Sequence, residues 1–329
     1  MNKRRKILIA LGASALASPL TAYAQNKVWR IGHLSARSRP GSFESDYVVG
    51  PFLRGMAELG YVEGKNLVIE WRFADSSAER LLAAANELAQ LKMDAIMTEN
   101  TTVTQAARKA TATIPIVMIS SSDPVRAGFV ASLARPGGNI TGLTSMSGDV
   151  SPKQFEMLLT IVPKLSRVAV LMNPANSGNL LILKSVLAAA WSTNAKILPV
   201  EARTVAEIEK AFATMARENV GAVIVAADSL FNQNMRQIVD RAAKQRLPSI
   251  AGGREFAEAG GLMSYGRNQA DSAQRAAVYV DKILKGAKPG ELPVEQPTKF
   301  DPVLNLKTAK ALAIKIPESI MLRATEVIR

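Results

Sequence analysis

Two clusters of short polar side chains follow apolar runs in the first half of the chain. Residues 98–102 (TENTT) form one cluster and residues 120–123 (SSSD) the other, and each stands at the start of an expected helix. A helix start offers unpaired backbone N–H groups and the positive end of the helix dipole, so either cluster is suited to bind a carboxylate. The competing interpretation is that these side chains are ordinary helix caps, with Pro124 at the first helical position.

Polar residues follow apolar runs in the second half as well. Asp228 comes after the run 220–226 (VGAVIVA), and its carboxylate is suited to face a ligand ammonium group. Capping the next helix is the equally simple alternative. Tyr265, at a presumed hinge, offers a ring and a hydroxyl group, although such residues are more often part of a core.

The residues needed for most covalent chemistry are missing. The 329-residue chain has no Cys and a single His, which argues against disulfides, thiol nucleophiles and the usual metal sites. The first expected strand ends in Leu34-Ser35-Ala36 without the G-x-G-x-x-G of a dinucleotide site, and no P-loop or G-x-S-x-G elbow occurs. We therefore expect no catalytic residue, no metal and no cofactor, and we interpret His33 as a packed strand residue.

Apolar runs alternate with helical patterns along the chain, which indicates parallel sheets with helices on both faces. We expect strands over residues 28–34, 66–72, 94–98, 114–119, 140–145, 168–172, 196–200, 220–226, 248–251, 260–265 and 300–305. We expect helices over residues 46–59, 78–91, 101–110, 153–161, 180–193, 205–218, 232–245, 269–284 and 307–313.

These elements form two βαβα halves of similar size. We expect the chain to cross between them first at the turn near residue 138, then near Tyr265, and finally around residues 297–302. Sheets of this kind bind ligands outside the carboxyl ends of their strands. The two polar clusters of the first half then lie at one sheet edge, and this proximity favours ligand binding over simple capping.

Basic residues outnumber acidic ones by 41 to 28, a net charge of +13. Four of the basic residues precede the apolar run 7–17, which is followed by Ala22-Tyr23-Ala24, and this order is that of a cleavable signal peptide over residues 1–24. The remaining 305 residues carry a diffuse +9 with few aromatic side chains, which disfavours nucleic-acid binding. The export route, general secretory or twin-arginine, stays open.

Residues 123–142 (DPVRAGFVASLARPGGNITG) resemble the signature of the ABC transporter substrate-binding protein family related to tryptophan-binding components. Supporting motifs are residues 60–67 (GYVEGKNL), Asn173-Pro174-x-Asn176, and residues 300–311 with the later Ile316-Pro317. The resemblance implies the type I periplasmic binding protein fold, an α/β architecture of two Rossmann-like lobes with parallel sheets joined by three crossover hinge segments. It implies lobe 1 over residues 25–143 plus 267–297, and lobe 2 over residues 144–266 plus 298–329.

The resemblance also implies where a ligand binds. In this fold the loops after the third and fourth strands of the first lobe hold a ligand carboxylate, and loops of the second lobe supply the opposing contacts. Together with the strand-end argument, it makes the following residues candidates for ligand binding: Ser35, Asn100, Thr101, Ser120, Ser121, Ser122, Asn173, Asp228, Gly252 and Tyr265.

We expect a periplasmic, monomeric solute-binding component of an ABC importer, not an enzyme. Its ligand would be an amino acid or another small carboxylate, aromatic ones included, and its partner an ABC permease in the inner membrane. An exported two-lobe α/β enzyme acting on a small carboxylate is the alternative. A repressor-like sensor would need a DNA-binding motif at the N-terminus. The export signal occupies that position, so this third possibility is disfavoured.

Overall fold

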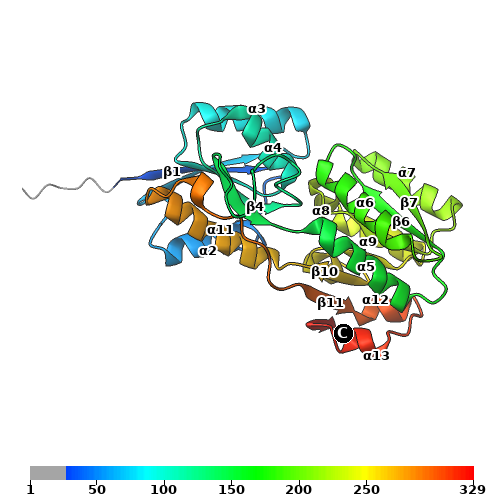
Figure 1. Ribbon diagram of the computed structural model, residues 1–329. Helices are drawn as coiled ribbons and strands as arrows, with labels where there is room; N and C mark the ends of the chain where they lie inside the picture. The colour runs from blue at the N-terminus through cyan, green and yellow to red at the C-terminus, as the bar shows by residue number, and fades with distance from the viewer. Residues whose placement is uncertain (1–26) are drawn as a thin grey trace, which may run out of the picture.

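The computed structural model describes residues 27–329, so the predicted signal peptide over residues 1–24 lies outside the described residues. Two α/β lobes stand side by side (Figure 1), each built on its own sheet. The predicted architecture of two Rossmann-like lobes is therefore confirmed. In the part of the chain that the structure describes, no helix is long and apolar enough to cross a membrane.

Lobe 1 contains a parallel five-stranded sheet in the order β2-β1-β3-β4-β5. Helices α2 and α11 pack together on one face, and α3 and α4 cover the other. The strands are β1 (Trp29–Ser35), β2 (Leu67–Phe73), β3 (Ala95–Thr98), β4 (Ile116–Ser121) and β5 (Ile140–Thr144). The helices are α2 (Val49–Glu58), α3 (Ala78–Gln90), α4 (Thr101–Ala110) and α11 (Gln269–Leu284), and the 3₁₀ helix η1 (Pro289–Glu291) contacts β5.

Lobe 2 contains a seven-stranded sheet in the order β12-β11-β10-β9-β8-β6-β7. Its strands are β6 (Arg167–Met172), β7 (Lys196–Glu201), β8 (Ala222–Val225), β9 (Ser249–Ala251), β10 (Met263–Gly266), β11 (Asp301–Asn305) and β12 (Glu326–Ile328). Its helices are α5 (Ser147–Ile161), α6 (Ser177–Ala190), α7 (Val205–Arg217), α8 (Ser229–Gln233), α9 (Met235–Lys244), α10 (Arg254–Glu258), α12 (Leu306–Ala311) and α13 (Glu318–Met321).

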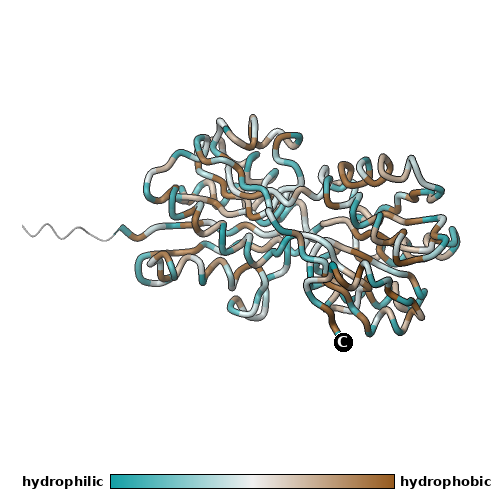
Figure 2. The backbone as a smooth tube through the Cα atoms, turned by 60° about the horizontal axis from the view of Figure 1, so that its bottom comes forward, coloured by the Kyte–Doolittle hydropathy of each residue, from teal (hydrophilic) through white to brown (hydrophobic). Residues whose placement is uncertain are grey.

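Each lobe has a buried apolar layer on both faces of its sheet, and hydrophobic stretches accordingly occur in both lobes (Figure 2). Strand β8 is apolar along its whole length, and β6 is apolar after Arg167, because parallel strands are covered on both faces. Several helices begin where a side chain caps them. Asn100, Asn176 and Thr204, for example, accept backbone N–H bonds at the starts of α4, α6 and α7.

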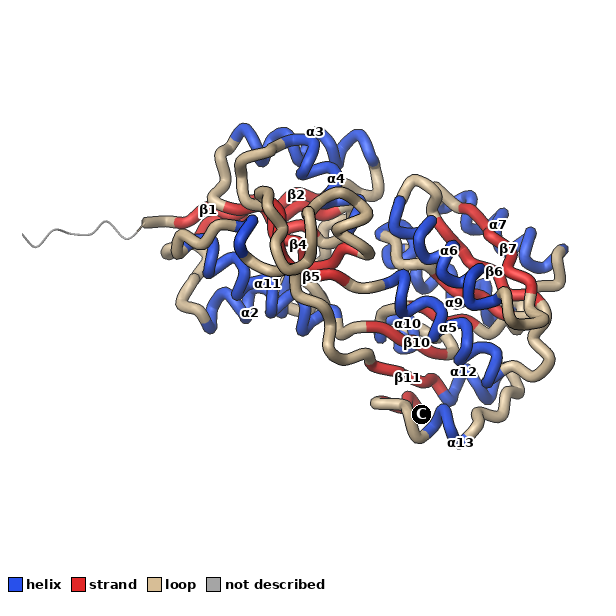
Figure 3. Tube along the Cα trace, in the orientation of Figure 1, coloured by secondary structure: helices blue, strands red, loops and turns tan. Residues whose placement is uncertain are grey.

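Three segments join the lobes (Figure 3), and the first differs from the prediction. The turn at residues 135–139 leads into β5, which still belongs to the first sheet, so the chain crosses only after Thr144. The second crossing lies between β10 and α11, and the third precedes β11. Because β10 runs toward the crossing and β11 runs away from it, these two strands pair antiparallel within an otherwise parallel sheet.

Candidate functional site

A cleft lies between the lobes at the carboxyl ends of β4, β8 and β9, where parallel sheets place their ligands. It encloses about 860 Å³, including the part open to solvent. Lobe 1 contributes Tyr47, Ser120 and Gln269, the first crossing contributes Ser145, and the second crossing contributes Arg267 together with Gly266 at the end of β10. Lobe 2 contributes Ser147, Val150, Ser151, Gln154, Ile182, Val225, Ala226, Ala227, Phe231, Asn232, Met235, Ala251, Gly252, Gly253, Glu255 and Phe256.

One wall of the cleft is the first half of helix α5. Ser147, Val150, Ser151 and Gln154 lie three and four residues apart and therefore share one face of the helix. Part of this polar face is already engaged, since Ser151 Oγ donates to the Ser147 carbonyl at 2.7 Å and Gln154 Nε2 donates to a lobe 2 carbonyl at 2.8 Å. The wall is thus a fixed polar surface within reach of a ligand.

The cleft combines aromatic rings with two opposite charges. Tyr47, Phe231 and Phe256 supply rings from both lobes. Glu255 and Arg267 are the two charged residues among those that line it. Such a lining suits a small, partly apolar molecule that carries charged groups.

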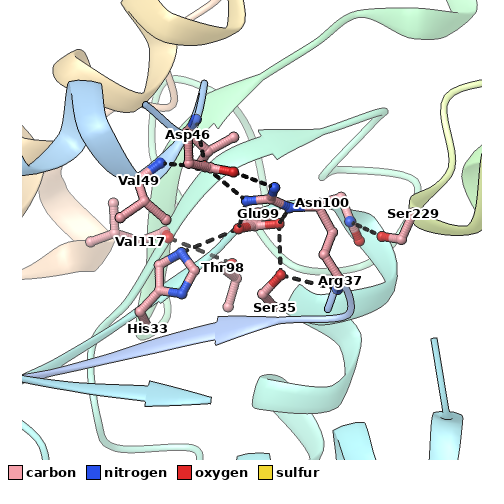
Figure 4. A network of polar contacts seen from close by, with 11 residues as sticks. His33, Ser35, Arg37, Asp46, Val49, Thr98, Glu99, Asn100, Val117 and Ser229 are labelled. Carbon is pink, nitrogen blue, oxygen red and sulfur yellow. Dashed lines mark hydrogen bonds and ion pairs between the residues drawn. The ribbon is translucent and has the colours of Figure 1, made fainter. Parts of the chain in front are cut away.

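A buried network of charges stands beside the cleft in lobe 1 (Figure 4). Arg37 makes a two-pronged contact with Glu99, Nε to Oε2 at 2.9 Å and Nη2 to Oε1 at 2.8 Å. Its Nη1 also donates to Asp46 Oδ2 at 2.8 Å. Ser35 Oγ donates to Glu99 Oε2 at 2.9 Å, and His33 Nε2 lies 3.2 Å from Glu99 Oε1. His33 itself is fully buried in β1, as the sequence predicts.

The electrostatics of this network favour charged carboxylates despite burial. Burial alone would raise the pKa of Glu99 and of Asp46, but the charge and hydrogen bonds of Arg37 outweigh it and hold both pKa values below their ordinary ranges. Burial lowers the pKa of Arg37 while Glu99 and Asp46 raise it, and the net effect is a raised pKa. The three groups are therefore charged at neutral pH, with the single cation of Arg37 held between two carboxylates.

The candidate residues of lobe 1 divide into two groups. Ser120 lines the cleft, and together with Asn100, Thr101 and Ser122 it also lines a smaller adjoining cavity. Asn100 additionally caps α4 and donates to Ser229 Oγ of lobe 2 at 2.6 Å. Neither Ser35 nor Ser121 lines either cavity: Ser35 is buried against Glu99, and Ser121 is buried at the end of β4.

The candidate residues of lobe 2 also fall into two groups, those that line a cavity and those that do not. Gly252 lines the cleft, and Asp228 lines the adjoining cavity. Asp228 Oδ1 accepts from the backbone N–H of Leu230 at 2.9 Å and Oδ2 from Asn176 Nδ2 at 2.9 Å, so it caps α8 as the alternative interpretation holds. Asn173 donates to Asp228 at 3.3 Å and lines neither cavity. Tyr265 likewise lines neither, and its ring lies 5.9 Å from that of Phe300.

Sequence reasoning missed several cleft residues. The α5 wall was missed because Gly148 and Pro152 favour a turn, and the prediction began the helix only after them. Glu255 and Arg267 were missed because each lies in or beside a short element with no distinctive motif. The spacing Ser147-Ser151-Gln154 was the one available signal, since it places three polar side chains on one helical face.

The fold and the interlobe cleft define a two-lobe ligand-binding protein. The model of the ABC transporter substrate binding protein family matches residues 44–328, and the chain belongs to this family. The described residues contain no group of three or more His, Asp or Glu side chains placed to hold a metal ion.

Individual relatives agree with this assignment. The chain is 27% identical over 262 residues to the tyrosine-binding protein of Clostridioides difficile, a match that covers 79% of this chain and 75% of that one. It is 26% identical to a conserved domain protein from Vibrio cholerae, with a TM-score of 0.85 over 92% of this chain and 100% of the other.

Two further solved structures share the fold. An ABC domain from Streptococcus pneumoniae in complex with L-Trp is 24% identical, with a TM-score of 0.83 over 91% of this chain and 99% of the other. The ligand-free, open structure of a substrate binding protein with adhesive properties from Clostridium difficile is 25% identical, with a TM-score of 0.64 over 92% and 99%.

Proposed function

We propose that this protein is the periplasmic solute-binding component of an ABC importer, and that it binds an amino acid or another small carboxylate between two closing lobes. The observation that carries the proposal is the cleft itself, which is lined by residues of both lobes, among them three aromatic residues, one cationic residue and one anionic residue. A ligand held from both sides stabilises the closed arrangement by its differential contacts, without any bond chemistry. Family membership supports this role.

An aromatic amino acid is the ligand class that we favour. Half-buried Tyr47 offers a ring from lobe 1, the almost fully buried Phe231 and Phe256 form part of the apolar wall in lobe 2, and Ser120 adds a hydroxyl group. The names of two relatives support the same class, since one is a tyrosine-binding protein and another was solved with L-Trp.

We further propose that the protein is exported by cleavage of residues 1–24, acts as a monomer, and delivers its ligand to a permease of the inner membrane. The basic head, short apolar run and Ala22-Tyr23-Ala24 site support export. The family, whose members bind substrates for ABC transporters, supports the permease partner.

One preparation tests both parts of the proposal. Mass spectrometry of the protein purified from the exported fraction should find a chain that starts at Gln25 and a small molecule carried through purification. Calorimetric titration of the ligand-free protein with the amino acids and with aromatic acids should then find a dissociation constant of about 1 μM or below, near −8 kcal/mol. Flat titrations throughout would contradict the ligand class, and an uncleaved chain would contradict the export.

A further inference from the structure

Two opposite charges of the cleft lack a direct partner. Arg267 Nη1 is buried and forms no hydrogen bond within residues 27–329. No carboxylate of the described chain lies within 4.0 Å of a guanidinium nitrogen of Arg267, Glu255 included. The hydrogen bond that the Glu255 carboxylate receives comes from its own backbone N–H. A cation and an anion thus face one cleft without forming an ion pair.

This arrangement is costly in the absence of a ligand. Burial raises the pKa of Glu255, and burial lowers the pKa of Arg267 to about 10, only partly opposed by the charge of Glu255. Arg267 is still a cation at neutral pH. Both residues are half-buried, and an unpaired charge that is partly removed from water is unfavourable, so a ligand that supplies the missing partners gains free energy from both.

The other charged groups near the cleft are already satisfied. Arg37 is paired with Glu99 and Asp46, and both oxygens of Asp228 accept hydrogen bonds from lobe 2. Glu255 and Arg267 therefore remain as the pair available to a charged ligand.

We propose that Glu255 and Arg267 form a zwitterion site, in which Glu255 binds the ammonium group of an α-amino acid and Arg267 binds its carboxylate. The inference rests on the proposed function and narrows it from small carboxylates to molecules that carry both charges. Arg267 suits the carboxylate because a planar guanidinium can donate two parallel hydrogen bonds to it.

The backbone holds Glu255 and Arg267 on neighbouring segments before a ligand arrives. Glu255 follows β9 and Arg267 follows the neighbouring β10, and these strands pair in parallel. At their ends the two backbones touch so closely that a Cβ atom added to Gly266 would lie 2.0 Å from the Gly252 carbonyl oxygen. The site is therefore preorganised within one edge of the second sheet, which reduces the entropy lost on binding.

Arg267 also lies in the crossing between the lobes and lines three neighbouring cavities. A carboxylate bound there contacts the segment that must move when the lobes open. Tyr47 and Ser120 of lobe 1 then close over the rest of the ligand from the other side.

The test pairs protein variants with truncated ligands. Glu255→Gln and Arg267→Gln are titrated by calorimetry with L-phenylalanine, L-tyrosine and L-tryptophan, and with phenethylamine and 3-phenylpropionate, which lack the carboxylate and the ammonium group respectively. Each variant should bind the amino acids with an affinity on the order of 10- to 100-fold lower than the wild-type protein, which is the effect of losing a charge-assisted hydrogen bond. Glu255→Gln should leave the weak affinity for 3-phenylpropionate unchanged within threefold, because that analogue has no ammonium group. Arg267→Gln should likewise leave the affinity for phenethylamine unchanged, because that analogue has no carboxylate.

Glu201→Gln and Arg217→Gln are the matched controls, because both residues are exposed, belong to lobe 2 and do not line the cleft. Thermal unfolding of each variant checks that it is folded. Equal losses for the amino acid and for its truncated analogue would overturn the pairing, as would unchanged affinities in both variants. If the wild-type protein carries a small molecule but binds no amino acid, the zwitterion site is wrong while the proposed binding function stands.

Discussion

Arg37 sets the position of two residues that face the space between the lobes. Its partner Glu99 immediately precedes Asn100, and its partner Asp46 immediately precedes Tyr47. Asp46 Oδ1 also accepts the backbone N–H groups of Val48 and Val49 at 2.9 and 2.8 Å, which holds the start of α2. Because Arg37 and Glu99 are 8% and 3% exposed, the network is rigid, and we expect it to support the cleft without contacting the ligand.

The substitution Glu99→Gln tests the energetic role of this network. It removes one of the two charges that compensate buried Arg37, so the free energy of unfolding should fall by about 3 kcal/mol. Urea unfolding followed by circular dichroism measures the change. Glu291→Gln is the control, because that exposed residue pairs only with exposed Lys288, and its effect should stay within about 0.5 kcal/mol.

The pH dependence of that difference has a definite sign. Arg37 holds the pKa of Glu99 below its ordinary value, so the stabilisation is present above pH 4 or so and is lost as the pH falls through the folded-state pKa. The gap between wild type and Glu99→Gln should therefore shrink below about pH 4. A gap that stays constant down to pH 2 or so would show that Glu99 acts through packing and not through its charge.

At the scale of elements, hydrophobic pattern and caps predict most of the fold. The helices over 78–91, 101–110 and 269–284 are found within one residue of their expected bounds because amphipathic faces and capping residues agree there. The hydrophobic pattern does not predict α10, α13 and β12, because elements of three to five residues are too short to show a period.

The same limit applies to the candidate site. The strand-end rule places Ser120, Asn100 and Gly252 at the interlobe space, because the position of a strand end follows from topology. It cannot tell that Ser35 is engaged by Glu99 and Asp228 by Asn176, since those partners lie 64 and 52 residues away in sequence. Which polar group stays free for a ligand is decided by tertiary contacts.

Gly142 is an element-scale position where only glycine fits. Its φ is +122°, and an added Cβ would lie 2.2 Å from the Met118 carbonyl oxygen, where the pairing of β4 and β5 changes register. Gly142→Ala should lower the free energy of unfolding by about 2–5 kcal/mol through clash and backbone strain. Gly138→Ala is the matched control, because no atom lies within 4 Å of its added Cβ. Equal urea midpoints for the two variants would contradict the packing described for β5.

At the scale of the whole molecule, hydrogen bonds bridge the two lobes outside the cleft. Gln233 of α8 donates from Nε2 to the Ala36 carbonyl at 3.1 Å and accepts from Ser76 Oγ at 3.1 Å, while Asn100 donates to Ser229. These contacts join loops of lobe 1 to the start and end of one short helix in lobe 2. Since opening would separate the partners, the contacts favour the closed arrangement by a small free energy.

Gln233→Ala should therefore shift the equilibrium between open and closed lobes without changing what the cleft recognises. The variant loses two hydrogen bonds, each with a net contribution of about 0.5–1.5 kcal/mol. Its affinity for every ligand should fall by about tenfold, because the apparent affinity scales with the fraction of protein molecules whose lobes are closed. The ratio of affinities between two amino acids should stay constant, since Gln233 does not line the cleft. Calorimetry measures the affinities, and small-angle X-ray scattering should show a larger radius of gyration for the ligand-free variant.

Gln245→Ala separates this effect from a general loss of stability. Gln245 Nε2 donates to the Phe212 carbonyl at 3.0 Å within lobe 2, so its removal costs a similar hydrogen bond without touching the interface between lobes. It should lower the unfolding temperature while leaving affinity and scattering at wild-type values. If Gln233→Ala behaved in the same way as Gln245→Ala, the bridging contacts would have no part in closure. The energy of closure would then come from the ligand and the three crossings alone.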